Sequence, residues 1–143
     1  MSAEVHEAVE ARLRGGVRYT PARRQLVGVL ARAGRPQTAE EIAASASELP
    51  MSSVYRNLAM FEETGVVRRL VSNADQARYE LAEAILGHHH HLTCSSCGAM
   101  TDVELPPRLE AQLDKAFDAV AATHGFEPVS HHVDLVGRCH DCR

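Results

Sequence analysis

The stretch that decides the fold covers residues 52–81 and is SSVYRNLAMFEETGVVRRLVSNADQARYEL. Its first half predicts a helix, because apolar residues recur at the spacing i, i+4, i+7, namely Val54, Leu58 and Phe61. A capping serine, Ser52 or Ser53, is expected to begin this helix and Gly65 to end it. The second half predicts two short strands, Val66–Val71 and Ala77–Leu81, and the Ser-Asn-Ala-Asp segment between them is typical of a hairpin turn.

The residues before this stretch predict further helices. Val5–Leu13 is expected to form a short one. Thr20 places a capping hydroxyl before Pro21 at the first helical position, and the apolar stripe that follows ends at Gly34. The sequence Thr38-Ala-Glu-Glu41 matches a capping box, which opens the next helix. Three helices followed by a hairpin predict a winged helix-turn-helix.

The composition indicates a globular protein. The chain has 143 residues, of which 45% are hydrophobic and 24% are charged, and this suits one domain of ordinary size or two small ones. No apolar run reaches the ~18 residues of a membrane span, and Met1–Glu10 lacks the basic start and apolar core of a signal peptide. We therefore expect a cytoplasmic protein without a membrane partner.

The formal net charge of −4 argues at first against a nucleic-acid partner. The charges are unevenly divided, however, because residues 1–80 hold eleven basic and ten acidic side chains, whereas residues 81–143 hold four and nine. Residues 11–39 contain seven Arg and no acid, which suits phosphate contacts; a solvated basic surface is the alternative interpretation. The expected exposed face of the helix near Ser52 adds three side chains able to reach phosphates and base edges: Tyr55, Arg56 and Asn57.

All four cysteines lie beyond residue 90, in two C-x-x-C pairs: Cys94, Cys97, Cys139 and Cys142. Without an export signal the thiols are expected to stay reduced, so that two pairs together predict a tetrahedral zinc site with no open position. Disulfides or a redox C-x-x-C are the alternatives. A closed site of this kind is structural and supplies folding free energy to a small domain.

A second folded unit is expected after residue 87. Three segments have strand character: His88–Thr93, Ala99–Val103 and Val129–Val136. Between them an apolar stripe predicts one helix that stops at Gly125 and packs into the core, and its residues are Leu109, Leu113, Phe117 and Val120.

Four consecutive histidines, His88–His91, precede the first cysteine pair. The run is internal and continues into a strand pattern, so it is not an expression tag. On an extended segment the side chains alternate, which points His88 and His90 one way and His89 and His91 the other. The run therefore predicts two separate metal-binding clusters, each completed by carboxylates or further histidines, and such ligands suit zinc, iron, nickel or manganese.

Taken together, these motifs resemble the ferric uptake regulator family of metal-responsive repressors. The motifs that carry the resemblance cover nearly the whole chain in order: Tyr19-Thr-Pro-Ala-Arg23, Ser53-Val-Tyr-Arg-Asn-Leu58, Arg78-Tyr-Glu-Leu81, the histidine run, Cys94-x-x-Cys97-Gly98, His124-Gly125-Phe126, Ser130-His131-His132 and Gly137-x-Cys139-x-x-Cys142.

The resemblance implies an α+β fold in two domains. These would be an N-terminal winged helix-turn-helix over residues 1–82, a hinge over residues 83–87, and a small α/β dimerisation and metal-binding domain with a four-cysteine zinc site over residues 88–143. It also implies a homodimer that binds an inverted repeat in double-stranded DNA when loaded with metal.

Functional residues follow from the resemblance position by position. The structural zinc ligands would be Cys94, Cys97, Cys139 and Cys142. A regulatory hinge site would use Glu80, His89, His91 and Asp102, and a second site would use His88, His90, Glu110 and His131, with Glu104 lying near Glu110 in sequence. His124 and His132 are interpreted as structural or supporting residues. For contact with DNA we select Arg18, Tyr55 and Arg56.

The chain departs from the family at two positions. Many members place a hinge-site histidine just before the helix that opens at Thr38, but here the sequence reads Arg35-Pro36-Gln37. The cysteine that zinc-sensing members often add before the histidine run is also missing near Ala82. The hinge site is therefore expected to have four protein ligands or to take a fifth from elsewhere, and the regulatory ion is Fe²⁺, Zn²⁺, Ni²⁺ or Mn²⁺.

The resulting prediction is a non-enzymatic transcriptional repressor that controls metal homeostasis genes, with metal at the hinge switching the homodimer into its DNA-binding form. Within the same family, the alternative is a peroxide sensor in which iron at the hinge oxidises a ligating histidine. An alternative of another class is a zinc hydrolase that uses Glu80 as base, although no HExxH-type helix is present. Metal storage would leave the arginine-rich segment and the winged helix unexplained.

Overall fold

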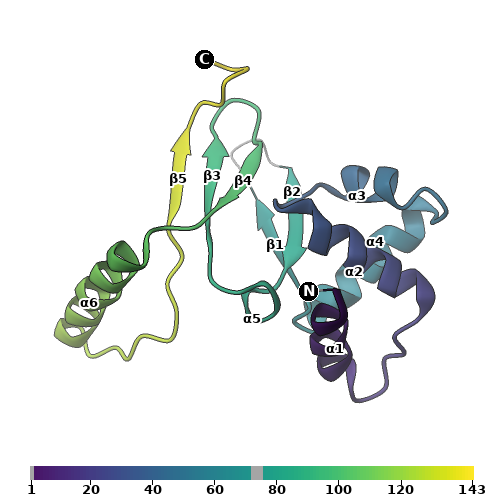
Figure 1. Ribbon diagram of the computed structural model, residues 1–143, viewed down its shortest axis with the longest axis horizontal. Coiled ribbons are helices and arrows are strands. Elements are labelled where there is room, and N and C mark those ends of the chain that lie inside the picture. Colours follow the sequence, from purple (N-terminus) through teal and green to yellow (C-terminus); the bar gives the residue numbers. More distant parts are fainter. Residues whose placement is uncertain (1, 72–75) are drawn as a thin grey trace.

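A computed structural model of the chain (Figure 1) describes residues 2–71 and 76–143. Its elements are, in chain order, α1 (Ser2–Leu13), α2 (Pro21–Ala33), α3 (Ala39–Ser45), α4 (Met51–Glu63), β1 (Val67–Val71), β2 (Ala77–Leu81), α5 (Glu83–Leu86), β3 (His90–Cys94), β4 (Met100–Val103), α6 (Pro107–Thr123) and β5 (Asp134–Gly137). The α+β class predicted from the sequence is confirmed.

The predicted caps of α2 and α3 are confirmed. Thr20 accepts a hydrogen bond from the backbone N–H of Arg23, and Gly34 ends α2 in the left-handed conformation at φ +63°. The capping box of α3 is complete, because Thr38 Oγ1 accepts from the N–H of Glu41 at 3.2 Å and a Glu41 carboxylate oxygen accepts from the N–H of Thr38 at 3.0 Å. Both helices therefore begin where local sequence dictates.

The apolar stripe of α4 is confirmed, but its predicted serine cap is wrong. The helix begins at Met51 with Pro50 at the N-cap, and no side chain caps it. Pro50 already holds a φ of −60°, and its carbonyl accepts from the N–H groups of Ser53 and Val54 at 3.0 and 3.1 Å. A serine cap one or two residues later is therefore not used.

The predicted hairpin is formed by β1 and β2, which pair antiparallel from Val67 opposite Leu81 to Val71 opposite Ala77. The first strand begins one residue later than expected. The turn predicted at Ser-Asn-Ala-Asp, residues 72–75, lies outside the described residues.

A hydrophobic core holds the helices against this hairpin. Its fully buried side chains come from α1 to α4, the segment between α4 and β1, and the hairpin, and every buried member precedes residue 82. Phe61, Leu26 and Ile42 are the largest of them. The winged helix-turn-helix arrangement is thus built around an apolar core of its own (Figure 1).

The second sheet has three strands in the order β4-β3-β5. β3 runs antiparallel to β4 and parallel to β5, so that His91 lies opposite Asp102 on one side and Asp134 on the other. β3 begins at His90 rather than His88, and β4 begins at Met100 rather than Ala99.

The strand predicted over Val129–Val136 is wrong for most of its length, since β5 comprises only Asp134–Gly137. The carbonyl of Val133 accepts a hydrogen bond from the ring of His90 at 3.0 Å instead of taking part in a strand ladder. The segment before β5 is thus held by a side chain.

Helix α6 corrects a further prediction, because its apolar stripe does not pack into a core of this chain. None of its residues is buried, and Leu109 and Val120 are 40% and 60% exposed. In Figure 1 the helix lies to the side of the three-stranded sheet. Among the described residues, no helix has the length and apolar character that a membrane crossing requires.

Candidate metal centres and DNA-binding face

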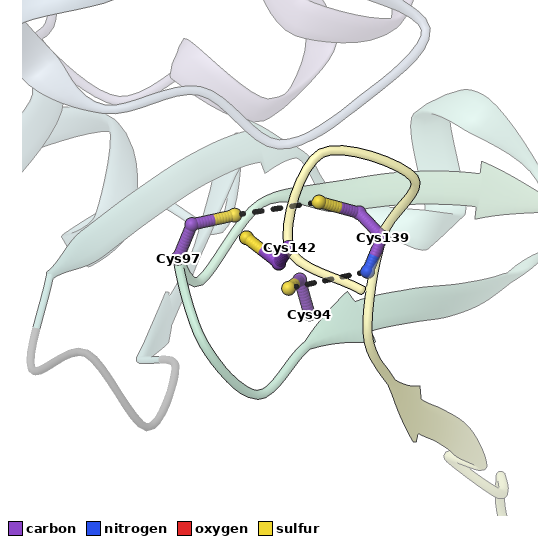
Figure 2. A group of neighbouring side chains, drawn as sticks. All are labelled: Cys94, Cys97, Cys139 and Cys142. Carbon is purple, nitrogen blue, oxygen red and sulfur yellow. Dashed lines mark hydrogen bonds between the residues drawn. The ribbon is translucent and has the colours of Figure 1, made fainter.

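The structure brings the four cysteines together, as Figure 2 shows. Cys94 ends β3 and Cys139 follows β5, and the parallel pairing of these strands places their carboxyl ends side by side. Sulfur atoms of Cys97 and Cys139 lie 3.8 Å apart, and the backbone N–H of Cys139 donates to the sulfur of Cys94 at 3.4 Å. All four thiols are free, so the disulfide alternative does not describe this structure.

The electrostatics of the cysteine cluster favour a bound cation. Backbone N–H groups of Cys139, Cys97 and Ser96 lower the pKa of Cys94 to about 6. Hydrogen bonds with the neighbouring thiols, Cys139 first, raise the pKa of Cys142 to about 12. Four sulfur donors within 4.8 Å of one another can all ionise only with a positive charge among them. The donor set therefore fits Zn²⁺.

The four residues of the expected hinge site also lie together: Glu80, His89, His91 and Asp102. Glu80 belongs to β2, His91 to β3 and Asp102 to β4, and His89 directly precedes β3. One oxygen of Glu80, Oε2, lies 3.0 Å from His89 Nε2 and 3.1 Å from His91 Nε2. Asp102 Oδ1 approaches the same two nitrogen atoms at 3.8 and 3.6 Å. We call this group the hinge cluster.

Hydrogen bonds on the far side of each ring orient the two imidazoles of the hinge cluster. His89 Nδ1 faces the carbonyl of Gly87 at 3.0 Å, and His91 Nδ1 faces a carboxylate oxygen of Asp134 at 3.2 Å. A proton on Nδ1 satisfies each of these acceptors, so that an ion replacing the Nε2 proton would meet an Nε2 lone pair directed into the cluster. Buttressing of this kind is typical of metal-binding histidines. The sequence did not predict this role of Asp134, because its contact with His91 comes from the pairing of β5 with β3.

Charges in the hinge cluster are unbalanced. Burial alone would raise the pKa of Glu80, but hydrogen bonds from His91 and His89 outweigh it and the pKa is lowered. Burial raises the pKa of Asp102. Asp102 Oδ1 is buried and has no hydrogen-bond partner among the described residues. An orphaned carboxylate oxygen beside two imidazoles fits a divalent cation.

A second cluster gathers His88, His90, Glu110 and His131. The Nε2 atoms of His88 and His131 face each other at 3.1 Å, and His131 Nε2 lies 3.3 Å from Glu110 Oε2. Glu110 Oε1 faces His90 Nε2. The carboxylate of this group is therefore that of Glu110, whereas Glu104 is outside it. Two imidazole nitrogens in direct contact also suit an ion between them.

Polar contacts on the far side of each ring recur in this second cluster. His90 Nδ1 lies 3.0 Å from the carbonyl of Val133, and His131 Nδ1 lies 3.2 Å from a carboxylate oxygen of Asp114. Glu83 contacts His88 Nδ1. All these rings consequently direct Nε2 inward. Asp114 and Glu83 are not among the residues that the sequence predicted for this site.

The stretch Arg35-Pro36-Gln37 brings no ligand to the hinge cluster. Gln37 instead pairs through its backbone with Tyr79, donating at 3.0 Å and accepting at 2.7 Å. Arg35 donates to Glu41 at 3.1 Å. Within residues 2–71 and 76–143, only the four predicted donors converge at the hinge.

On the helical face, Tyr55 and Arg56 of α4 are exposed, as is Arg18 in the loop before α2. The expectation that Asn57 shares this exposed face is wrong: Asn57 is buried, accepts from Arg23 Nε at 2.9 Å and donates to the carbonyl of Ser53 at 2.9 Å. Arg23 also donates to the carbonyl of Arg18. Asn57 and Arg23 thus fix the Arg18 loop against α4.

The model of the ferric uptake regulator family matches residues 14–136. The chain belongs to this family, whose members are DNA-binding, dimeric transcriptional regulators and not enzymes. The hydrolase alternative is thereby excluded.

Individual relatives differ in the signal that their names state. The chain is 28% identical to the peroxide operon regulator of Bacillus subtilis, over 97% of this chain and 93% of that protein. It is 26% identical to a peroxide-responsive repressor of Staphylococcus epidermidis, over 98% of this chain and 91% of that protein. The fold matches the solved structure of the ferric uptake regulator of Helicobacter pylori with a TM-score of 0.76. That protein, described with three functional metal binding sites, is 25% identical to this chain, and the match covers 99% of this chain and 93% of that one.

Proposed function

We propose that this chain is a metal-dependent transcriptional repressor whose DNA affinity is controlled by a divalent ion at the hinge cluster. The observation that carries the proposal is the geometry of Glu80. It belongs to the wing strand β2, yet its Oε2 faces two imidazoles at the start of the second sheet. A ligand set divided in this way couples the position of the winged helix to the presence of an ion.

The residues of the hinge cluster have separate roles in this scheme. Glu80 would bring the winged helix to the ion, while His89, His91 and Asp102 would hold it from the second sheet. The ion, Fe²⁺, Zn²⁺, Ni²⁺ or Mn²⁺, would add positive charge beside the two carboxylates of the cluster. Metal-free protein would sample other hinge angles, and its apparent DNA affinity would fall with the competent fraction.

The organisation around the hinge follows the same proposal. Residues 1–82 would be the DNA-binding domain, residues 83–87 the hinge, and residues 88–143 the dimerisation and metal-binding domain. The four cysteines would hold a structural Zn²⁺, and the second cluster would be a further divalent-metal site. Exposed apolar side chains of α6, the segment after it and β5 support a homodimer formed through this region: Leu109, Val120, Phe126, Val129, Leu135 and Val136.

Contact with DNA would come from Arg18, Tyr55 and Arg56. In the homodimer two α4 helices would lie about one DNA turn apart, which an inverted-repeat operator matches. Tyr55 donates to Glu40 at 2.9 Å in the free protein, so that its ring is already oriented at the surface. Arg56 would contact phosphate, and its replacement by Ala should weaken binding and reduce the salt slope by about 1.

The test is a titration of protein without metal at the hinge cluster with Fe(II), Zn(II), Ni(II) and Mn(II), each in turn. The affinity for operator DNA is measured at each step at one fixed salt concentration. His89→Ala should remain a folded, zinc-containing dimer whose DNA affinity no longer rises with metal. His124→Ala, which changes an exposed histidine outside all three clusters, is the matched control. A metal response retained by His89→Ala would contradict the hinge assignment.

Peroxide sensing is the second candidate, and the names of the curated relatives favour it. In that case the iron-loaded protein would gain one oxygen on His89 or His91 after peroxide treatment and would lose DNA binding. Mass spectrometry of the peptide that contains residues 88–91 distinguishes the two candidates. Loss of DNA binding without added oxygen would exclude this mechanism.

A further inference from the structure

Arg68 of β1 is a partly buried cation that the proposed function does not use. Its Nε lies 3.5 Å from Glu80 Oε1, and its side chain is 28% exposed. The contact is an ion pair without hydrogen-bond geometry, since among the described residues Nε has no hydrogen-bond partner. Glu80 therefore faces a positive charge with one oxygen and the imidazoles of His89 and His91 with the other.

The same guanidinium reaches beyond the hairpin. An Arg68 Nη1 atom lies 3.0 Å from His132 Nδ1, and since a guanidinium can only donate, the imidazole nitrogen accepts. His132 belongs to none of the three metal-capable clusters. Arg68 thus joins β1 to the segment before β5, next to the connection that Glu80 makes with His91.

Charge decides what this arrangement does to a metal ion. The hinge cluster offers two carboxylates and two imidazoles, and Arg68 already compensates one carboxylate when no ion is bound. A divalent ion at Glu80 Oε2 would have to share that carboxylate with a fixed positive charge. A unit charge at this range, in a partly buried site, changes the binding of another charge by on the order of tenfold or more.

We propose that Arg68 sets the metal affinity of the hinge cluster, because its guanidinium holds Glu80 Oε1, leaves Oε2 to the ion and opposes the ion's charge. The inference rests on the proposed role of the hinge cluster. Arg68 acts as a positioning residue through Glu80. It raises the concentration of free divalent ion at which the cluster fills.

The test is a Co(II) titration of the zinc-loaded protein, followed by ligand-field absorption. A background that carries both Glu110→Gln and His131→Ala leaves the second cluster only two of its four ligands and so keeps it from competing for Co(II). Arg68→Gln should bind Co(II) about tenfold more tightly than its background, whereas Arg68→Lys, which keeps the charge, should stay near the background value. Arg68→Met, which keeps the aliphatic stem, is the second neutral variant and should behave like Arg68→Gln.

Arg69 provides the matched control. It is the next residue of β1, is exposed, and by strand alternation points to the opposite face. Arg69→Gln removes the same charge from the same strand and should leave Co(II) affinity unchanged. The proposal is overturned if the neutral variants at Arg68 bind Co(II) no more tightly, or if Arg69→Gln produces the same gain.

Glu80→Gln separates this inference from the function on which it rests. Undiminished Co(II) binding by Glu80→Gln would refute the hinge site itself. Binding that depends on Glu80 but is indifferent to Arg68 would refute only the role of Arg68. In the metal-free protein, ¹⁵N shifts of the His132 ring give a separate readout: acceptance from Arg68 places the proton on Nε2, and Arg68→Gln should change that signature.

Discussion

The two halves of this molecule are stabilised by different means. Up to Leu81, apolar side chains of four helices and a hairpin are buried against one another. Beyond residue 82, Cys94 and Met100 are the buried hydrophobic residues among those that the structure describes, and His90 and His91 are buried beside them. The second half places polar, ligand-bearing side chains where a core would be expected.

This difference indicates what each half requires in order to stay folded. A core of aliphatic and aromatic residues needs no additional component, and the capped helices around it begin where local sequence directs. A unit that supplies most ligands of three clusters, and whose helix α6 exposes an apolar stripe, would on the proposed function depend on ions and on a second chain. The dependent half is therefore the part suited to sensing, and the self-sufficient half is suited to rigid contact with DNA.

The largest expected effect is that of Cys97→Ser on the second half. Loss of one thiolate should release zinc and remove much of its folding contribution, which is about 10 kcal/mol or more for sites of this kind. Calorimetry should show the transition of the second half shifted or lost, while that of the first half persists. Ser96→Ala changes the same turn without removing a ligand and is the control. A single, unshifted transition in Cys97→Ser would remove the contrast between the halves.

A smaller effect is expected on dimerisation, at the apolar side chains that the second half exposes. Val129 is 98% exposed in the single chain, and in a dimer formed through this face a carboxylate at its position would be buried without a partner. Val129→Asp should therefore weaken dimerisation about a hundredfold, or about 3 kcal/mol. Sedimentation equilibrium measures the change, and Val71→Asp, at an exposed position of the wing, is the control. Equal dimer affinities in the two variants would place the interface elsewhere.

The sequence predicted features that depend on near neighbours and missed those that depend on distant ones. The capping box of Thr38 and Glu41 lies within four residues, and the alternation of the histidine run needs only an extended backbone. Strand β5, by contrast, is defined by its pairing with β3, some forty residues earlier in the chain, so its start at Asp134 could not be found from local pattern.

Burial of a polar side chain is equally non-local. Asn57 lies on the same face of α4 as Val54 and Leu58 and was expected at the surface only because it is polar; the side chain that pairs with it, Arg23, comes from another helix. The ligand sets of the two histidine clusters follow from the family resemblance and not from the residues alone, since nothing local connects Glu110 of α6 to the histidine run. The residues alone predict the four-cysteine set and the division of the histidine run into two faces.

The smallest expected effect concerns an ionisable group in the first half. Burial alone would raise the pKa of Glu41, but hydrogen bonds from Arg35 and the Thr38 backbone, with the charges of Arg35 and Arg78, lower it below its usual 4.5. A carboxyl whose folded pKa is lowered stabilises the protein above the unfolded value and loses that contribution as pH falls through the folded value. Since the side chain is 38% exposed, the contribution is about 1 kcal/mol or less.

Glu41→Gln isolates this effect from acid release of metal in the second half, because both proteins share the same ligands. The difference in unfolding free energy between wild type and Glu41→Gln should be constant from pH 7 to about 5 and should shrink below about 4.5, as measured by denaturant titration. A difference that instead grew on acidification would show that Glu41 is destabilised in its charged form. Acid effects common to both proteins come from other carboxyls whose pKa is lowered, among them Glu40 beside Tyr55 in the first half and Glu80 in the hinge cluster, and the comparison with Glu41→Gln removes them.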